Sequence, residues 1–130
     1  MNVKGSFEVK MTPEPPYDVV EGVSLARARF DKTFTGPLEG TSTVAFLSAR
    51  TSVATSAGYV ALERVDAVLE GRRGTFVVVH TGLMNRGVSS LTITIVPDSG
   101  TGDLTGISGK MGIEIVEGKH VYELDYEIRC

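Results

Sequence analysis

The N-terminal residues alternate between apolar and polar side chains. From Val3 to Met11 every second residue falls on one face, whereas Lys4, Ser6 and Glu8 fall on the other. A period of two residues indicates a β-strand with one face toward a core. No segment longer than a turn or two carries the 3.6-residue period of a helix. The pattern therefore predicts an all-β chain.

Turn-forming residues divide this pattern into about eight strands. The expected strands cover residues 2–11, 22–34, 38–48, 56–70, 73–83, 88–97, 104–116 and 119–129. Several exceed ten residues, which favours a barrel, because closure removes the exposed edges of a sheet. We expect one domain, residues 1–130, folded as an eight-stranded antiparallel up-and-down β-barrel,.

Two-residue loops fix the expected register of three hairpins. They are placed at Gly71-Arg72, Asn85-Arg86 and Glu117-Gly118. The opposed pairs include Glu63–His80, Val65–Val78, Phe76–Ile95, Val78–Ile93, Met111–Leu124 and Ile113–Tyr122. All three registers agree on the inner face, and a slip of one residue would expose every apolar set. The strand at 22–34 is the least determined, because Lys32 shares a face with apolar neighbours.

The expected interior is apolar except for six residues. Its apolar members are Phe7, Val9, Val65, Phe76, Val78, Ile93, Ile95, Met111, Ile113, Ile115 and Leu124. The inward polar residues are Tyr59, Glu63, His80, His120, Tyr122 and Tyr126. Counting residues from the turns places all of them except Tyr126 in the half of the barrel near Asn85-Arg86 and Glu117-Gly118. These six are the candidate ligand-binding residues.

Glu63 and His80 form the sharpest candidate for chemistry. A carboxylate beside an imidazole fixes its tautomer and suits it to general acid or base work. The alternative is an ion pair that only orders the core. Glu63, His80 and His120 also match the inventory of a metal site. Because the two histidines lie on non-neighbouring strands, we expect no metal there. We also expect no other cofactor. Arg27 and Arg29 share one strand face, which could hold an anion if it were inward.

The glycine-rich stretch VPDSGTGDLTGISG, residues 96–109, resembles a phosphate-binding motif only superficially. Gly109-Lys110 is followed by Met111, so the phosphate-loop spacing fails, and the spacing of a dinucleotide fingerprint fails as well. We therefore predict a turn followed by a strand in which glycines permit bending.

Composition indicates in which compartment the protein works and which partners it does not bind. A net charge of −3 provides no basic surface for nucleic acid,. No apolar run is long enough for a transmembrane helix, and the N-terminus lacks the apolar run of a signal peptide. The single cysteine, Cys130, can form no internal disulfide and fits a reducing cytoplasm,. We expect a cytoplasmic protein that binds neither nucleic acid nor membrane.

Three segments resemble a small bacterial family of unknown function, domain-of-unknown-function family 3224. They contain the HxG at His80, the SGTG at Ser99 and the GKHxY at Gly118. That family is similar in fold to the allene oxide cyclase-like barrels. The resemblance implies an eight-stranded barrel. More distantly, it implies enzymes that cyclise polyene- or oxylipin-like substrates without a cofactor, and homo-oligomers, since plant members form trimers. We carry over no catalytic residue of that superfamily to this chain.

Three hypotheses follow. The first is a barrel that binds a small, mainly apolar molecule. The second is a cofactor-free cyclase or isomerase in which His80, poised by Glu63, moves a proton. The third is a filled barrel that serves as a structural or oligomeric module. An open cavity above about 300 Å³ near Glu63 and His80 would favour the first two. Plugging by Phe7, Phe76 and Met111 would favour the third.

Overall fold

Nine strands form one antiparallel sheet that closes on itself. The structure is a computed structural model that describes residues 1–129. The strands are β1 (Asn2–Pro13), β2 (Asp18–Val20), β3 (Val23–Thr35), β4 (Leu38–Arg50), β5 (Ala57–Leu69), β6 (Arg72–Asn85), β7 (Val88–Ile95), β8 (Ile107–Val116) and β9 (Lys119–Ile128). From β2 to β9 each strand pairs with its neighbours in sequence, and β1 closes the ring by pairing with both β9 and β3. The predicted eight-stranded antiparallel barrel is confirmed, with β2 as a short extra strand beyond it.

Two of the three predicted hairpin registers were wrong by two residues. The β5–β6 loop is Glu70-Gly71, so Glu63 lies opposite Val78. The β6–β7 loop is Arg86-Gly87. Both central residues of each loop have positive φ, with glycine second, which is the type I′ turn that matches the twist of a hairpin,. Since a shift of two residues leaves every side chain on its face, the inner face was still predicted correctly. The β8–β9 register, with Met111 opposite Leu124, is confirmed.

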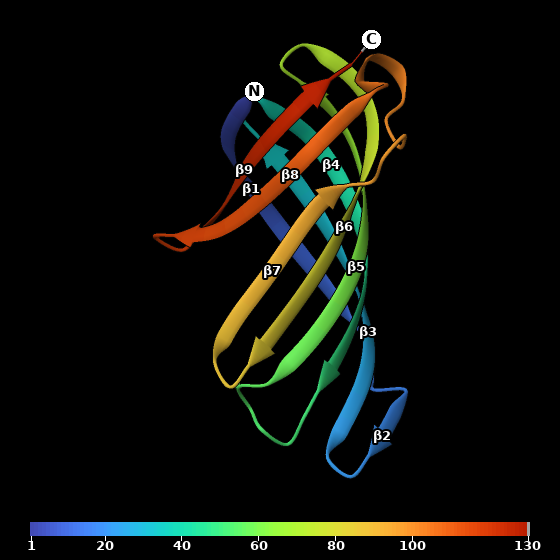
Figure 1. Cartoon of the computed structure of the whole chain (residues 1–130), viewed down its shortest axis with the longest axis vertical. Coiled ribbons are helices and arrows are strands. Elements are labelled where there is room, and N and C mark those ends of the chain that lie inside the picture. Colours follow the sequence, from blue (N-terminus) through green and yellow to red (C-terminus); the bar gives the residue numbers. More distant parts are fainter. Residues whose placement is uncertain (130) are drawn as a thin grey trace.

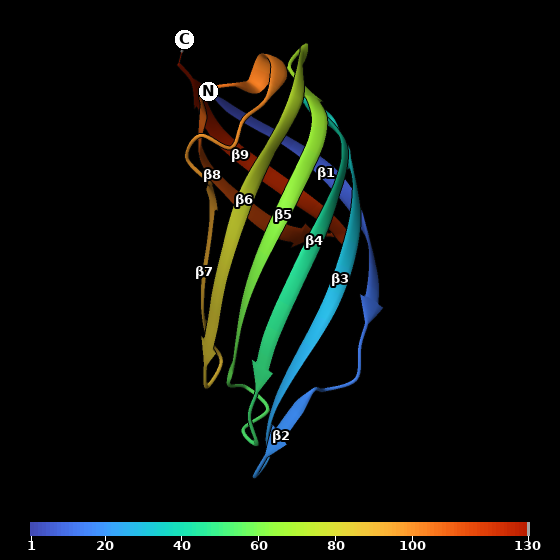
Figure 2. The same cartoon turned by 90° about the vertical axis from the view of Figure 1, so that its right-hand side faces the viewer.

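The barrel has a packed half and an open half. In Figure 2, β8 and β9 cross only the upper part of the molecule and β1 ends a little below its middle, whereas β3 to β7 continue toward the lower end. Seventeen side chains fill the upper part, which we call the packed half: Val3, Phe7, Phe34, Leu38, Val65, Ala67, Leu69, Phe76, Val78, Ile93, Ile95, Leu104, Ile107, Met111, Tyr122, Leu124 and Tyr126. The lower part, built mainly from β3 to β7, is the open half.

β7 and β8 separate along one side of the open half, and we call this separation of the two strands the slit. These strands pair only at Ile93–Met111 and Thr94–Lys110 and diverge below that point (Figure 1). Two residues predicted to be interior, Val9 and Ile115, lie on the inner face but are 37% and 70% exposed. The prediction assumed that the barrel closes along its whole length, which it does not.

The glycine-rich stretch forms the loop between β7 and β8 at the packed end. It contains one 3-10 turn, η1 (Gly102–Leu104), so β8 begins three residues later than predicted. Ser99 Oγ accepts a hydrogen bond from the Val77 amide, and Thr101 Oγ accepts one from the Thr75 amide. Leu104 is fully buried. The loop therefore accepts hydrogen bonds from the backbone of β6 beyond the end of β7, and it covers the core.

No helix within residues 1–129 has the length and apolar character needed to cross a membrane. The prediction that concerns Cys130 lies outside the described residues.

Candidate functional site

A buried carboxylate joins four strands at the boundary between the two halves. Glu63 on β5 is fully buried, and its Oε1 lies 2.7 Å from His80 Nε2 on β6 and 3.2 Å from Lys32 Nζ on β3. Ser42 on β4 donates to the other oxygen, Oε2. Lys32 and His80 are 8% and 4% exposed. A buried charge needs such partners, because a lone carboxylate in this environment would be strongly destabilising.

The Glu63–His80 contact forms along a diagonal of the sheet. Glu63 lies opposite Val78, whereas His80 lies opposite Ala61. Long side chains on the same face reach across such diagonals, so the pair forms although its residues are not directly opposed. The expected partnership is therefore present in the structure for a geometric reason that differs from the predicted one.

The cluster holds Glu63 in its ionised form. Burial alone would raise the pKa of Glu63, but the hydrogen bond from His80, the charge of Lys32 and the hydrogen bond from Ser42 outweigh it and lower the pKa,. An ionised carboxylate only accepts hydrogen bonds, so the His80 nitrogen facing it, Nε2, carries a proton. In a neutral imidazole the other nitrogen, Nδ1, is then a hydrogen-bond acceptor.

A cavity of about 200 Å³ adjoins this cluster. Taken alone, it is smaller than the roughly 300 Å³ that would favour a binding or enzymatic barrel. Its lining is mainly aromatic and aliphatic: Phe7, Val9, Phe30, Lys32, Val44, Phe46, Tyr59, Ala61, His80, Ile113 and His120. His80 Nδ1 has no hydrogen bond among residues 1–129, although every buried side-chain nitrogen or oxygen atom of those residues has one. Nδ1 is therefore not fully buried, and the His80 side chain that carries it lines the cavity. The Lys32 ammonium lies 4.8 Å from the centre of the Phe7 ring and has donors to spare beyond its bond to Glu63.

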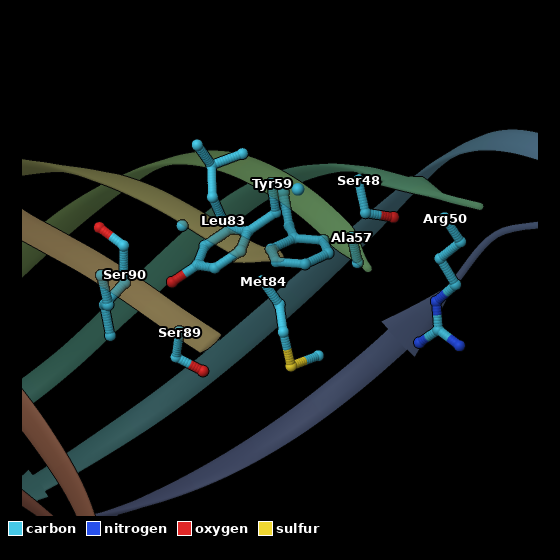
Figure 3. A pocket seen from close by; sticks show the side chains of 12 residues that line it. Ser48, Arg50, Ala57, Tyr59, Leu83, Met84, Ser89 and Ser90 are labelled. Carbon is cyan, nitrogen blue, oxygen red and sulfur yellow. The ribbon is translucent and has the colours of Figure 1, made fainter. Parts of the chain in front are cut away.

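A second hollow of about 320 Å³ continues toward the lower end. It shares Phe46 and Tyr59 with the first, and it also borders Met84 and Leu91. Figure 3 shows Tyr59 and Met84 among the side chains that line it. Tyr59 stacks on Phe46 with ring centres 4.9 Å apart. The Tyr59 ring fills the place that a side chain at position 82 would occupy, since a Cβ added to Gly82 would lie 2.2 Å from Tyr59 Cε1. Burial and the charge of Glu63 both raise the pKa of Tyr59.

Two predicted site residues lie in the packed half instead. The Tyr122 hydroxyl accepts a hydrogen bond from the Leu38 amide at 2.9 Å and donates to the Leu38 carbonyl at 3.1 Å. Tyr126 is hydrogen-bonded to Glu70 beside the β5–β6 turn. The predicted height of Tyr122 was wrong, because counting residues from turns ignores the stagger between tilted barrel strands. Tyr59, Glu63, His80 and His120 do gather around the cavity and its wall.

The remaining candidates do not form an ion-binding centre. Across residues 1–129, no three side chains of the His, Cys, Asp and Glu types lie close enough to hold a metal ion. His120 packs against Phe7, with ring centres 5.2 Å apart, rather than joining Glu63 and His80. Arg29 pairs with Asp31 at 3.0 Å, and Arg27 lies over the Tyr17 ring, so this face of β3 is the outer one.

Lys32 and Ser42 were not among the predicted site residues. Both stand at inward positions of otherwise apolar or small alternating patterns, Ala28-Phe30-Lys32-Phe34 and Leu38-Gly40-Ser42-Val44. An inward lysine requires a buried carboxylate, and Glu63 was already expected inside. That requirement was the sequence signal that could have placed Lys32 beside Glu63.

These features define a small β-barrel that is packed at one end and hollow at the other. Residues 3–126 match the family described as a protein of unknown function, DUF3224, and the chain belongs to this family. A crystal structure of a DUF3224 protein of unknown function from Shewanella oneidensis MR-1 is 46% identical in sequence, with a TM-score of 0.94. That alignment covers 100% of this chain and 98% of the Shewanella chain. A search of curated proteins finds no match.

Proposed function

We propose that the open half binds a small, mainly apolar molecule. The observation that carries this proposal is a mainly aromatic cavity into which two polar groups project, Lys32 Nζ and His80 Nδ1. Binding sites for small molecules are typically apolar with a few such polar groups that set the orientation. Assignment of the barrel to the allene oxide cyclase-like superfamily is part of the same proposal.

The two polar groups suggest how the ligand is oriented. Lys32 donates hydrogen bonds, whereas His80 Nδ1 accepts them when the imidazole is neutral. A hydroxyl or carboxylic acid group at one end of the ligand can satisfy both. The apolar remainder would lie along Phe46 and Tyr59 toward Met84, over the length of both hollows.

Filling the cavity tests the proposal. Ala61 lines it on the inner face of β5, and Leu62, the next residue, lies on the outer face with 56% of its surface exposed. Ala61→Phe should abolish binding of an environment-sensitive apolar dye, as measured by fluorescence titration, whereas the matched Leu62→Phe should retain it. Thermal unfolding of both variants shows whether each is folded. Equal dye binding by two folded variants would overturn the proposal.

The Glu63–His80 pair favours a second candidate function, a cofactor-free cyclase or isomerase. The Nε2–Oε1 hydrogen bond orients the ring, and Nδ1 faces the cavity, where it could remove a proton from a bound substrate,. Native mass spectrometry of protein purified from its source cells should identify a retained molecule. If His80→Ala then binds that molecule but no longer converts it, the enzymatic function is favoured. Equal conversion by His80→Ala and the wild type would exclude His80 as the base.

A further inference from the structure

The lower part of β7 is a free strand edge. On one side Val88 to Thr92 pair with β6, but on the other side no strand of residues 1–129 pairs with them, because β7 meets β8 only at Ile93 and Thr94. All five residues from Val88 to Thr92 are exposed. Alternate amide and carbonyl groups along this edge are therefore directed away from the sheet, where another strand could bind them.

This edge lacks the features that usually prevent strands of different molecules from pairing. Between Thr81 and Val96 the one charged residue is Arg86, in the turn, and there is no proline before Pro97. The facing edge of β8 is different, because it carries Glu114 and is followed by Glu117 in its turn. Natural sheet edges are usually protected by charges, prolines or bulges. The sequence of β7 thus lacks this protection where the strand is most accessible.

Exposed apolar side chains surround the same edge on both faces of the sheet. Leu83 is 63% exposed, Val88 73% and Leu91 47%. In the β6–β7 hairpin Leu83 lies opposite Ser90, and Met84 lies opposite Ser89. A strand added to β7 would therefore bury apolar surface as well as satisfy backbone groups.

We propose that this edge pairs with the same edge of a second copy of the chain, antiparallel and centred on Ser90. In that arrangement Ser90 faces Ser90 of the second copy, Ser89 faces Leu91, and Val88 faces Thr92. A twofold axis keeps each inner face continuous, so the two open halves join in one sheet across β7. Any charge on β7 near the axis would meet its own copy, so an uncharged strand suits self-pairing. Because few residues are paired, we expect a dimer that dissociates on dilution.

Charge substitution at Ser90 tests this arrangement. Ser90→Lys places two lysines directly opposite each other, and Ser90→Glu places two glutamates there, so each variant alone should be monomeric. An equimolar mixture should form the heterodimer, because the opposed charges then attract. Thr41, exposed on β4, is the matched control. Thr41→Lys and Thr41→Glu should dimerise as the wild type does. Native mass spectrometry and sedimentation velocity over a dilution series would measure each state.

Three results would overturn the proposal. The first is a wild type that stays monomeric up to its solubility limit. The second is a dimer that Ser90→Lys and Ser90→Glu leave intact, which would mean that the two copies meet through another surface. The third is a mixture that shows no heterodimer although both variants are folded. Ser90 borders the second hollow, so dye binding by the Ser90 variants is not used to judge the dimer, whereas no residue of β7 lines the cavity beside His80.

Discussion

The packed and open halves of the barrel share the same alternating pattern of inward and outward side chains but differ in how far the inward ones are buried. Val65 and Phe76 are inward in the packed half and fully buried, whereas Leu91 in the open half and Ile115 near the end of β8 are inward and 47% and 70% exposed. The difference arises because β8 leaves β7 after two paired residues. Alternation thus determines which way a side chain points, while closure of the sheet determines whether it is buried.

The two halves also differ in how densely their interiors are packed. Apolar burial is concentrated where the strands close, so that half supplies most of the stability. In the other half Phe46 and Tyr59 contact a hollow rather than a filled core. The buried cluster around Glu63 lies between the two halves, and its polar side chains Lys32 and His80 border the cavity.

The largest expected difference in stability is between alanine substitutions of two phenylalanines, one in each half. Phe76→Ala in the packed half should lower the free energy of unfolding by about 4 kcal/mol, because it leaves a cavity in a filled core. Phe46→Ala should cost less than half of that, since its ring already borders empty space, but it should weaken binding of an apolar dye. Chemical denaturation and fluorescence titration measure the two effects. Equal losses of stability would show that the halves do not differ in packing.

Removing the charge of Glu63 tests whether its buried ion pair with Lys32 stabilises the boundary between the two halves. Glu63→Gln should lower the free energy of unfolding by about 3 kcal/mol at neutral pH, because Lys32 loses its buried partner. The pKa of Glu63 is lowered in the folded state, so its stabilisation is present above the ordinary carboxyl range and is lost as the pH falls through the folded pKa,. The variant should therefore lose less stability on acidification than the wild type.

Denaturant unfolding at a series of pH values measures this difference. Glu39→Gln, at an exposed position of β4, is the matched control and should follow the wild type. A Glu63→Gln variant with wild-type stability at neutral pH would contradict the proposed role of the ion pair.

The smallest effect is expected at alkaline pH, in the packed half. Burial and the hydrogen bond to Glu70 raise the pKa of Tyr126 to about 12. The unfolded chain ionises this phenol first, so its contribution to stability is complete below the ordinary tyrosine pKa of about 10 and is lost as the pH approaches 12,. Tyr126→Phe should reduce this alkaline loss, and Tyr17→Phe, at an exposed position, should not. Thermal unfolding between these pH values checks the comparison.

Much of the fold could be predicted from alternation and turn chemistry. The eight main strands and the inner face of most of them are local properties of the sequence. The loop at Gly71 was misplaced because glycine can stand first or second in a tight turn, and only the twist of the assembled sheet selects the second position. The slit could not be predicted, because the divergence of β7 from β8 depends on the whole barrel.

The candidate site was predictable in composition but not in arrangement. Glu63 and His80 stood out as polar residues on an apolar face, and they are in contact. Tyr122 stood out for the same reason, yet its hydroxyl binds the backbone of Leu38. The difference depends on strand stagger, which pairs residues far apart in sequence and leaves no local signal.

The four tight turns have a consequence for how the chain folds. Glu21-Gly22, Glu70-Gly71, Arg86-Gly87 and Glu117-Gly118 all have the same left-handed backbone conformation. Each can bring its two strands together from a short stretch of chain, at low loop-closure entropy. The pairing of β1 with β9, in contrast, joins residues at opposite ends of the sequence, such as Val3 and Leu124. Because such non-local contacts form slowly, we expect the hairpins to assemble early and the contact of β1 with β9 to limit the folding rate.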